Sequence, residues 1–105
     1  ARRYMLTAER FPADTAQRLG LIHQVVEQFD EVIPPLLQQL LANSPAAMAA
    51  AKTLALRVDQ QPLNDAIRRY TIEQIASIRV SPEGQEGLTA FLAKRPPQWA
   101  SKSTT

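Results

Sequence analysis

The residue types that most often carry enzymatic chemistry are scarce in this sequence. It has no cysteine and a single histidine, His23, within a β-branched stretch. Nucleophilic catalysis needs a base beside a serine, threonine or cysteine, and a zinc site needs three or four ligands. We therefore predict that His23 is a structural or surface residue, and that these 105 residues hold no catalytic residue and no metal site.

The acidic residues suit structural roles better than proton transfer. Glu83 and Glu86 lie three residues apart at the start of a predicted helix, where acids complement the positive end of the helix dipole. Glu73 follows Arg69 by four residues, which is the spacing of a surface ion pair. The three glycines are too scattered to form a phosphate-binding loop. Neither acid–base catalysis nor a glycine-rich nucleotide site is predicted.

One binding site is predicted near the end of the chain. Phe91 precedes Lys94 and Arg95 by three and four residues, so the three side chains can share a helix face. An aromatic ring beside a cation can hold a flat, phosphate-bearing ligand by stacking and charge. The alternative is that Phe91 belongs to the core while Lys94 faces solvent, and the sequence pattern leaves both interpretations open.

Helices must position these residues. A serine followed by proline indicates a helix start at Ser44 and again at Ser81, and Gly20 suits a left-handed helix end. The stretch 21–26 is β-branched and predicts one short strand. The proline pair 34–35 is expected in the first turn of its helix or just before it. The expected helices cover residues 2–8, 12–19, 30–41, 45–58, 63–79 and a last segment from Pro82 to just before Pro96.

The helix expected over 63–79 is apolar on more than one side. One set of apolar residues has core-like spacing, and a second set lies on a different side. The first set is Leu63, Ala66, Ile67 and Tyr70, and the second is Ile72, Ile75 and Ala76. An apolar surface this wide predicts burial on two sides. In so small a domain, the second side is expected to meet another domain or another subunit.

Composition limits the class of protein. With 45% apolar and 21% charged residues, the chain has the balance of a soluble globular domain. A net charge of +2 gives nucleic acid little attraction, and no apolar run approaches the roughly 20 residues that span a bilayer. We predict no nucleic-acid partner, no membrane segment and, because cysteine is absent, a reducing, cytoplasmic location. The start, without an initiator methionine, is interpreted as the interior of a longer protein.

Several motifs occur in an order that resembles one protein family. The first two are the segment 4–11, YMLTAERF, and the segment 16–22, AQRLGLI, which a valine pair follows. Next comes Ser44-Pro45 before an alanine-rich helix that contains Lys52, and the last is the segment 81–97, SPEGQEGLTAFLAKRPP. In this order, and over nearly the whole chain, they resemble the enoyl-CoA hydratase/isomerase (crotonase) family.

The resemblance implies that these residues are the C-terminal part of a longer enzyme. Its fold is then mainly α, a small helical domain with one short extended strand, and the family's spiral ββα core is absent. The family's oxyanion hole and its acidic catalytic residues lie in that missing core. The longer enzyme is expected to hydrate or isomerise an acyl-CoA thioester, while the chain alone is expected not to catalyse a reaction.

The resemblance also implies a division of the chain and a site. Residues 1–28 would hold the end of a core helix, a short helix and the strand, and residues 98–105 would be a flexible tail. Residues 29–97 would cover the active site, bind CoA and build a trimer or a dimer of trimers. The family's last helix carries an aromatic residue and a lysine that contact the CoA adenine and phosphates, and Phe91 and Lys94 match them. The coenzyme A thioester is the expected substrate, with no covalently bound cofactor.

The sequence departs from the family pattern at three positions. Ala8 stands where glycine is usual, so that turn is expected to avoid a positive φ angle. Pro12 replaces a capping Asp or Ser, and Ala93 replaces a common Glu. Substrate choice stays open between a short enoyl-CoA or methylglutaconyl-CoA hydratase and an isomerase. A different class of function, a stand-alone helical protein-interaction module without CoA binding, also stays open. In either case the isolated chain is expected to self-associate.

Overall fold

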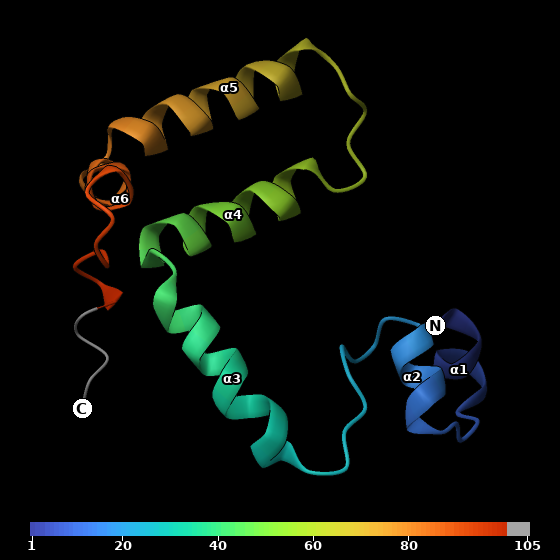
Figure 1. Cartoon of the computed structure of the whole chain (residues 1–105). Helices are drawn as coiled ribbons and strands as arrows, with labels where there is room; N and C mark the ends of the chain where they lie inside the picture. The colour runs from blue at the N-terminus through green and yellow to red at the C-terminus, as the bar shows by residue number, and fades with distance from the viewer. Residues whose placement is uncertain (101–105) are drawn as a thin grey trace. The chain divides into compact units, whose positions relative to one another are not determined.

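The computed structural model describes residues 1–100, and these form helices joined by turns and, between residues 19 and 28, by a longer irregular segment (Figure 1). The helices are α1 (Arg2–Thr7), α2 (Ala13–Arg18), α3 (Phe29–Ala42), α4 (Pro45–Val58), α5 (Asp65–Val80) and α6 (Pro82–Leu92). The mainly α prediction is confirmed. The predicted strand is wrong, because residues 21–26 form bends and irregular structure, and residues 1–100 contain no strand. A β-branched stretch becomes a strand only beside a partner strand that takes up its backbone hydrogen bonds.

The chain divides into two compact units, Ala1–Pro35 and Leu36–Thr105. The boundary falls inside α3, directly after Pro34 and Pro35. Both prolines lie in the helix interior, beyond the first turn where they were expected. Because proline has no N–H group, α3 lacks two backbone hydrogen bonds at this point. The predicted division at residues 28 and 97 is a functional one that these units do not test, and residues 101–105 of the expected tail lie outside the described residues.

The first unit contains an aromatic pair with its two rings tilted against each other by 51°. The rings of Tyr4 and Phe11 lie 4.5 Å apart between centroids, and the Arg3 guanidinium lies over the Tyr4 ring. Between them the chain turns at Ala8, which has φ 54° and ψ 24° in the left-handed region. The expectation that an alanine here avoids a positive φ angle is therefore wrong. The turn keeps its glycine-like geometry because the Ala8 N–H donates to the Tyr4 carbonyl at 3.0 Å, while Arg3 pairs with Glu9 across it at 3.0 Å.

In the second unit, α4, α5 and α6 pack against one another. Both Ser-Pro helix starts are confirmed: Ser44 accepts a hydrogen bond from the Ala47 N–H, and Ser81 accepts one from the Gly84 N–H. Ser81 also ends α5, so a single residue separates α5 from α6. The start of α5 falls two residues later than predicted, because Asn64 caps it by accepting from the Ile67 N–H.

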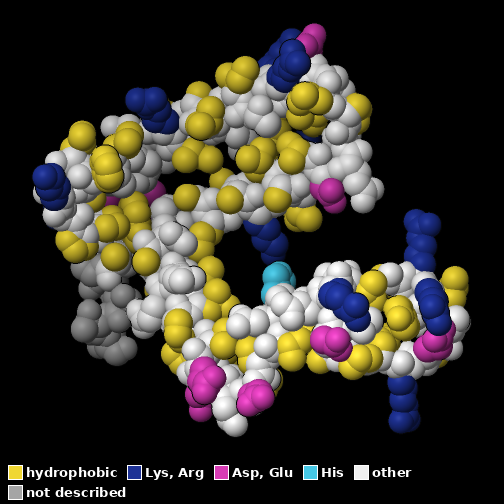
Figure 2. Space-filling view, turned by 45° about the vertical axis from the view of Figure 1, so that its right-hand side comes forward, with side chains coloured by type: hydrophobic (Ala, Val, Ile, Leu, Met, Phe, Trp, Pro, Cys, Tyr) yellow, Lys and Arg dark blue, Asp and Glu magenta, His cyan; other side chains and the backbone are white. Residues whose placement is uncertain are grey.

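Most large apolar side chains of the described residues are exposed. Ala90 on α6, at 2% exposure, is the only buried hydrophobic residue in that range. An open groove of about 520 Å³ runs between α4 and α5, lined mainly by small and aliphatic side chains. Figure 2 shows uncovered hydrophobic side chains along these helices, where Leu56, Ile72 and Ile75 are exposed. Of the first apolar set predicted for this helix, Ile67 and Tyr70 are half-buried, but Ala66 is exposed and Leu63 lies before α5. Of the second set, Ile72 and Ile75 are exposed.

Candidate functional site

The end of α6 forms a well-defined backbone turn. The Lys94 N–H donates to the Phe91 carbonyl at 3.1 Å, and the Arg95 N–H donates to the Ala90 carbonyl at 3.0 Å. These two bonds form a Schellman motif, in which the residue after the helix cap adopts a left-handed conformation. That residue is Lys94, with φ 52°. A residue with a Cβ in this conformation costs about 1–2 kcal/mol, so glycine is usual here.

The two predicted ligand-binding residues lie on either side of this turn. Phe91 is on α6 and is 80% exposed. Lys94 lies beyond Leu92, the last residue of the helix, and is also exposed. The sequence predicted that Phe91 and Lys94 share a helix face. They do not, because α6 ends between them, at Leu92. The Schellman turn brings Lys94 back instead, with its N–H bonded to the Phe91 carbonyl.

Arg95, the other cation of the predicted site, is held by Glu86. Its two terminal nitrogens donate to the two Glu86 oxygens at 2.7 and 3.0 Å, which is a bidentate contact. The hydrogen bond from Arg95 lowers the pKa of Glu86 below its ordinary value. Partial burial raises this pKa and so opposes the shift, whereas the hydrogen bond from the Gln98 N–H at 2.9 Å lowers it further. Glu86 is therefore the ionised partner of a fixed ion pair, not a proton donor.

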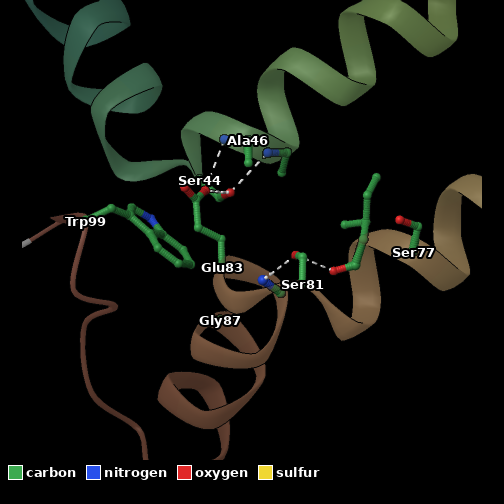
Figure 3. A pocket seen from close by; sticks show the side chains of 10 residues that line it. Ser44, Ala46, Ser77, Ser81, Glu83, Gly87 and Trp99 are labelled. Atoms are coloured by element: carbon green, nitrogen blue, oxygen red, sulfur yellow. Dashed lines mark hydrogen bonds between the residues drawn. The ribbon is translucent and has the colours of Figure 1, made fainter.

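A small cavity of about 350 Å³ lies where α4, α5 and α6 meet (Figure 3). Glu83, from the first turn of α6, points to the start of α4, where it accepts hydrogen bonds from the Ser44 hydroxyl and, at 3.0 Å, from the Ala46 N–H. The Ser44 bond and then the Ala46 bond lower the pKa of Glu83 below its ordinary value. Ser81, on the opposite wall, donates to the Ile78 carbonyl at 2.7 Å. Ser44, Ser81 and Glu83 are all engaged in hydrogen bonds that join or cap the helices, whereas Ser77 also lines the cavity and its hydroxyl makes no hydrogen bond within the described part of the chain. A lone serine with no base beside it is not a nucleophilic site.

Sequence reasoning missed the long-range role of Glu83. It was interpreted as an acid that complements the dipole of its own helix, but it also binds the first turn of α4, 37 residues earlier. The available signal was the repetition of Ser-Pro at positions 44 and 81, which places two helix starts in one chain. Nothing in the spacing indicates that the two starts meet.

Trp99 closes one side of the same cavity. Its Nε1–H donates to the Ala42 carbonyl, the last residue of α3, at 3.1 Å. Its ring lies against Gly87 on α6, where an added Cβ would be 3.2 Å from the ring (Figure 3). The segment after α6 thus folds back along that helix, and Gly87 permits this close approach.

The remaining candidates from the sequence are not gathered into a site. His23 is exposed in the first unit, and among residues 1–100 no three His, Cys, Asp or Glu side chains lie close enough to hold a metal ion. Arg69 and Glu73 do not form the expected ion pair; the ion pairs within residues 1–100 are Arg3–Glu9, Arg18–Asp14 and Arg95–Glu86. Within the same range, no helix has the length and apolar character needed to cross a membrane.

Comparisons with known proteins identify the family. A family model described as enoyl-CoA hydratase/isomerase matches residues 1–102. An enoyl-CoA hydratase from Shewanella pealeana has a similar structure, with a TM-score of 0.89 and 48% identity, over 94% of this chain and 37% of that one. The Pseudomonas aeruginosa protein AtuE superposes with a TM-score of 0.83 and 38% identity, over 94% of this chain and 39% of that one. Carnitinyl-CoA dehydratase from Salmonella typhi is 31% identical over 103 residues.

The chain belongs to the enoyl-CoA hydratase/isomerase family. The resemblance read from its ordered motifs is confirmed. The chain spans about 40% of the length of the curated relatives that it matches, and those matches include 93% of the chain.

Proposed function

We propose that this chain is the C-terminal helical part of a longer enoyl-CoA hydratase/isomerase enzyme, and that Phe91 and Lys94 contact the CoA portion of its acyl-CoA substrate. The observation that carries the site is an exposed aromatic ring three residues before an exposed lysine, at the end of α6. In the family that this chain belongs to, such a pair meets the adenine and the phosphates of CoA. No covalently bound cofactor is required.

The electrostatics of the α6 end support this role. Among residues 1–100, Lys94 forms none of the ion pairs, whereas its neighbour Arg95 is neutralised by Glu86. A lysine ammonium contributes to phosphate binding as a compact point charge. A flat aromatic face beside it offers stacking to a purine ring. Catalysis itself would depend on an oxyanion hole and acidic residues in the rest of the enzyme, which we place upstream of this chain.

The test is steady-state kinetics of the full-length enzyme with a 2-enoyl-CoA substrate. Phe91→Ala and Lys94→Ala are each expected to raise KM with kcat nearly unchanged, because a contact to the distant CoA end binds ground state and transition state alike. Matched controls are Leu92→Ala, an exposed apolar residue beside Phe91, and Lys52→Ala, an exposed lysine on α4. An unchanged KM in both Phe91→Ala and Lys94→Ala would refute the CoA site.

The exposed apolar surfaces support a second part of the proposal, which is self-association. Monomeric proteins rarely leave contiguous apolar patches this open. The α4–α5 groove, which the exposed Ile72 and Ile75 line, is the candidate for contact with the rest of the enzyme or a sister subunit. We expect a trimer or a dimer of trimers for the whole enzyme, in the cytoplasm. Native mass spectrometry tests the assembly, and a strictly monomeric enzyme would contradict it.

A stand-alone interaction module is the alternative function. The same apolar surfaces could serve a different protein partner without any CoA role. The two functions differ in ligand binding: the module predicts no measurable affinity for free coenzyme A, while the enzyme predicts saturable binding that Lys94→Ala weakens. Isothermal titration of coenzyme A into the full-length protein distinguishes them.

A further inference from the structure

The two cations that follow α6 are in different electrostatic states. Arg95 is fully engaged, with its bidentate contact to Glu86 and a third hydrogen bond from Nη1 to the Pro96 carbonyl at 3.1 Å. Lys94 takes part in none of the ion pairs of residues 1–100, and no hydrogen bond involves its ammonium. Lys94 is therefore the cation that remains available to an anionic ligand.

Glu86 organises the chain reversal that follows α6. One of its oxygens accepts from both Arg95 and the Gln98 N–H, and the other accepts from the second terminal nitrogen of Arg95. The Glu86 side chain is only 17% exposed, against 41% for Glu9 in the other bidentate pair of the described residues. A bidentate arginine–carboxylate contact fixes direction as well as distance, and shielding from water strengthens it relative to ordinary surface pairs.

The arginine of this ion pair directly follows Lys94 in the chain and takes part in the same turn through its backbone N–H. The Arg95 N–H closes the Schellman turn on Ala90, the one buried hydrophobic residue in the described range. Lys94, held inside that turn, has a left-handed backbone that a residue with a Cβ adopts only where its surroundings hold it. If Arg95 were released, the turn would lose its outer anchor, and Lys94 could relax to the more stable right-handed or extended conformations.

We propose that Glu86 and Arg95 are positioning residues for CoA binding, whose ion pair holds Lys94 at a fixed separation from Phe91. The ammonium then meets the phosphates while the ring meets the adenine. This inference rests on the proposed function above, since it assumes that Phe91 and Lys94 are the CoA contacts. Neither positioning residue needs to touch the ligand.

A double-mutant cycle in the full-length enzyme tests the proposal, with free coenzyme A as the probe and its Kd as the readout. The variants are Glu86→Gln, Lys94→Ala and their double variant, with Phe91→Ala measured beside them. Glu86→Gln keeps the size of the side chain but removes its charge. The matched control is Glu9→Gln, which weakens the other bidentate arginine pair. We expect Glu86→Gln to weaken binding about three- to tenfold, Glu9→Gln to leave it unchanged, and Glu86→Gln to add nothing once Lys94 is already alanine.

Each outcome separates the two hypotheses. If Lys94→Ala and Phe91→Ala leave the Kd unchanged, the proposed CoA site fails and this inference fails with it. If Lys94→Ala weakens binding but Glu86→Gln does not, the positioning role alone is refuted. If Glu86→Gln weakens binding equally with and without Lys94, its effect is general and structural, and the positioning role is again refuted. As a second variant, Arg95→Lys should reproduce the loss, because a lysine cannot make the bidentate contact.

Discussion

The contact between α5 and α6 depends on the absence of a side chain at position 84. A Cβ placed on Gly84 would approach the Ile78 carbonyl oxygen to less than 3.0 Å and would lie 3.1 Å from the Arg79 carbonyl oxygen. Both atoms belong to the backbone at the end of α5, so neither can move without shifting that helix. The same Ile78 oxygen accepts the Ser81 hydroxyl, whose oxygen accepts the Gly84 N–H. The change Gly84→Ala must therefore disturb the helix junction and its cap together.

The magnitude follows from three opposing contributions. Overpacking against fixed atoms costs about 1–3 kcal/mol, and disruption of the Ser81 cap costs about 0.5–2 kcal/mol. Alanine regains about 1 kcal/mol because it favours the helix over glycine. We expect Gly84→Ala to reduce the free energy of unfolding by about 0.5–4 kcal/mol.

A matched control lies one turn further along the same helix. A Cβ on Gly87 would lie 3.2 Å from the far edge of the Trp99 ring, a contact that a tilt of the ring by a few tenths of an ångström about its hydrogen bond to Ala42 would relieve. Gly87→Ala is therefore expected to be neutral or stabilising by up to about 1 kcal/mol. The assay is urea unfolding of the full-length protein followed by far-UV circular dichroism, where 2 kcal/mol corresponds to a midpoint shift of about 1 M. Equal stability of the two variants would refute the close approach at Gly84.

Three further predictions follow from the cap, the first turn and the ion pair. Ser44→Ala removes the N-cap of α4 and one hydrogen bond to Glu83, and it should destabilise the protein by about 0.5–2 kcal/mol in the same urea assay; no change would contradict the cap. Ala8→Gly should stabilise by up to about 1 kcal/mol, because glycine relieves the left-handed strain; a clear loss of stability would argue against a positive φ angle at this position. The pKa of Glu86 is lowered in the folded state, so the stabilisation from its pair with Arg95 is complete above the ordinary glutamate pKa of about 4.3 and is lost as the pH falls through the lower folded value. The fluorescence of the only tryptophan should follow this loss at acid pH, and a Glu86→Gln variant with the same pH profile would refute the assignment.

Local signals in the sequence were sufficient for most helix boundaries. The Ser-Pro caps at 44 and 81 act within three residues of themselves, so their hydrogen bonds could be anticipated without knowing the fold. The left-handed Gly20 was predicted on the same local basis and is observed at φ 77°. The start of α5 was placed at the apolar Leu63, two residues too early, because the capping residue Asn64 was overlooked.

The candidate site was only partly predictable. Phe91 and Lys94 were identified by residue type and by resemblance to the family, and both are exposed at the end of α6. The helical spacing assumed for them was wrong, because the chain leaves the helix at Ala93 and reverses. Glu86, nine residues before Arg95 and outside the range of any local pattern, bonds Arg95 and the Gln98 N–H within the reversed segment.

What the sequence by itself determined is the family, the helical character and the places where helices begin, since each depends on motifs or on contacts between near neighbours in the chain. What only the tertiary structure decided is how distant residues complete one another's hydrogen bonds. Glu83 reaches the start of α4, Trp99 reaches the end of α3, and the stretch 21–26 stays irregular in the absence of a partner strand. Buried backbone groups need hydrogen-bond partners, and the fold supplies them from segments that are distant in the sequence. The spacing of residues along the chain does not show which distant segment supplies the partner.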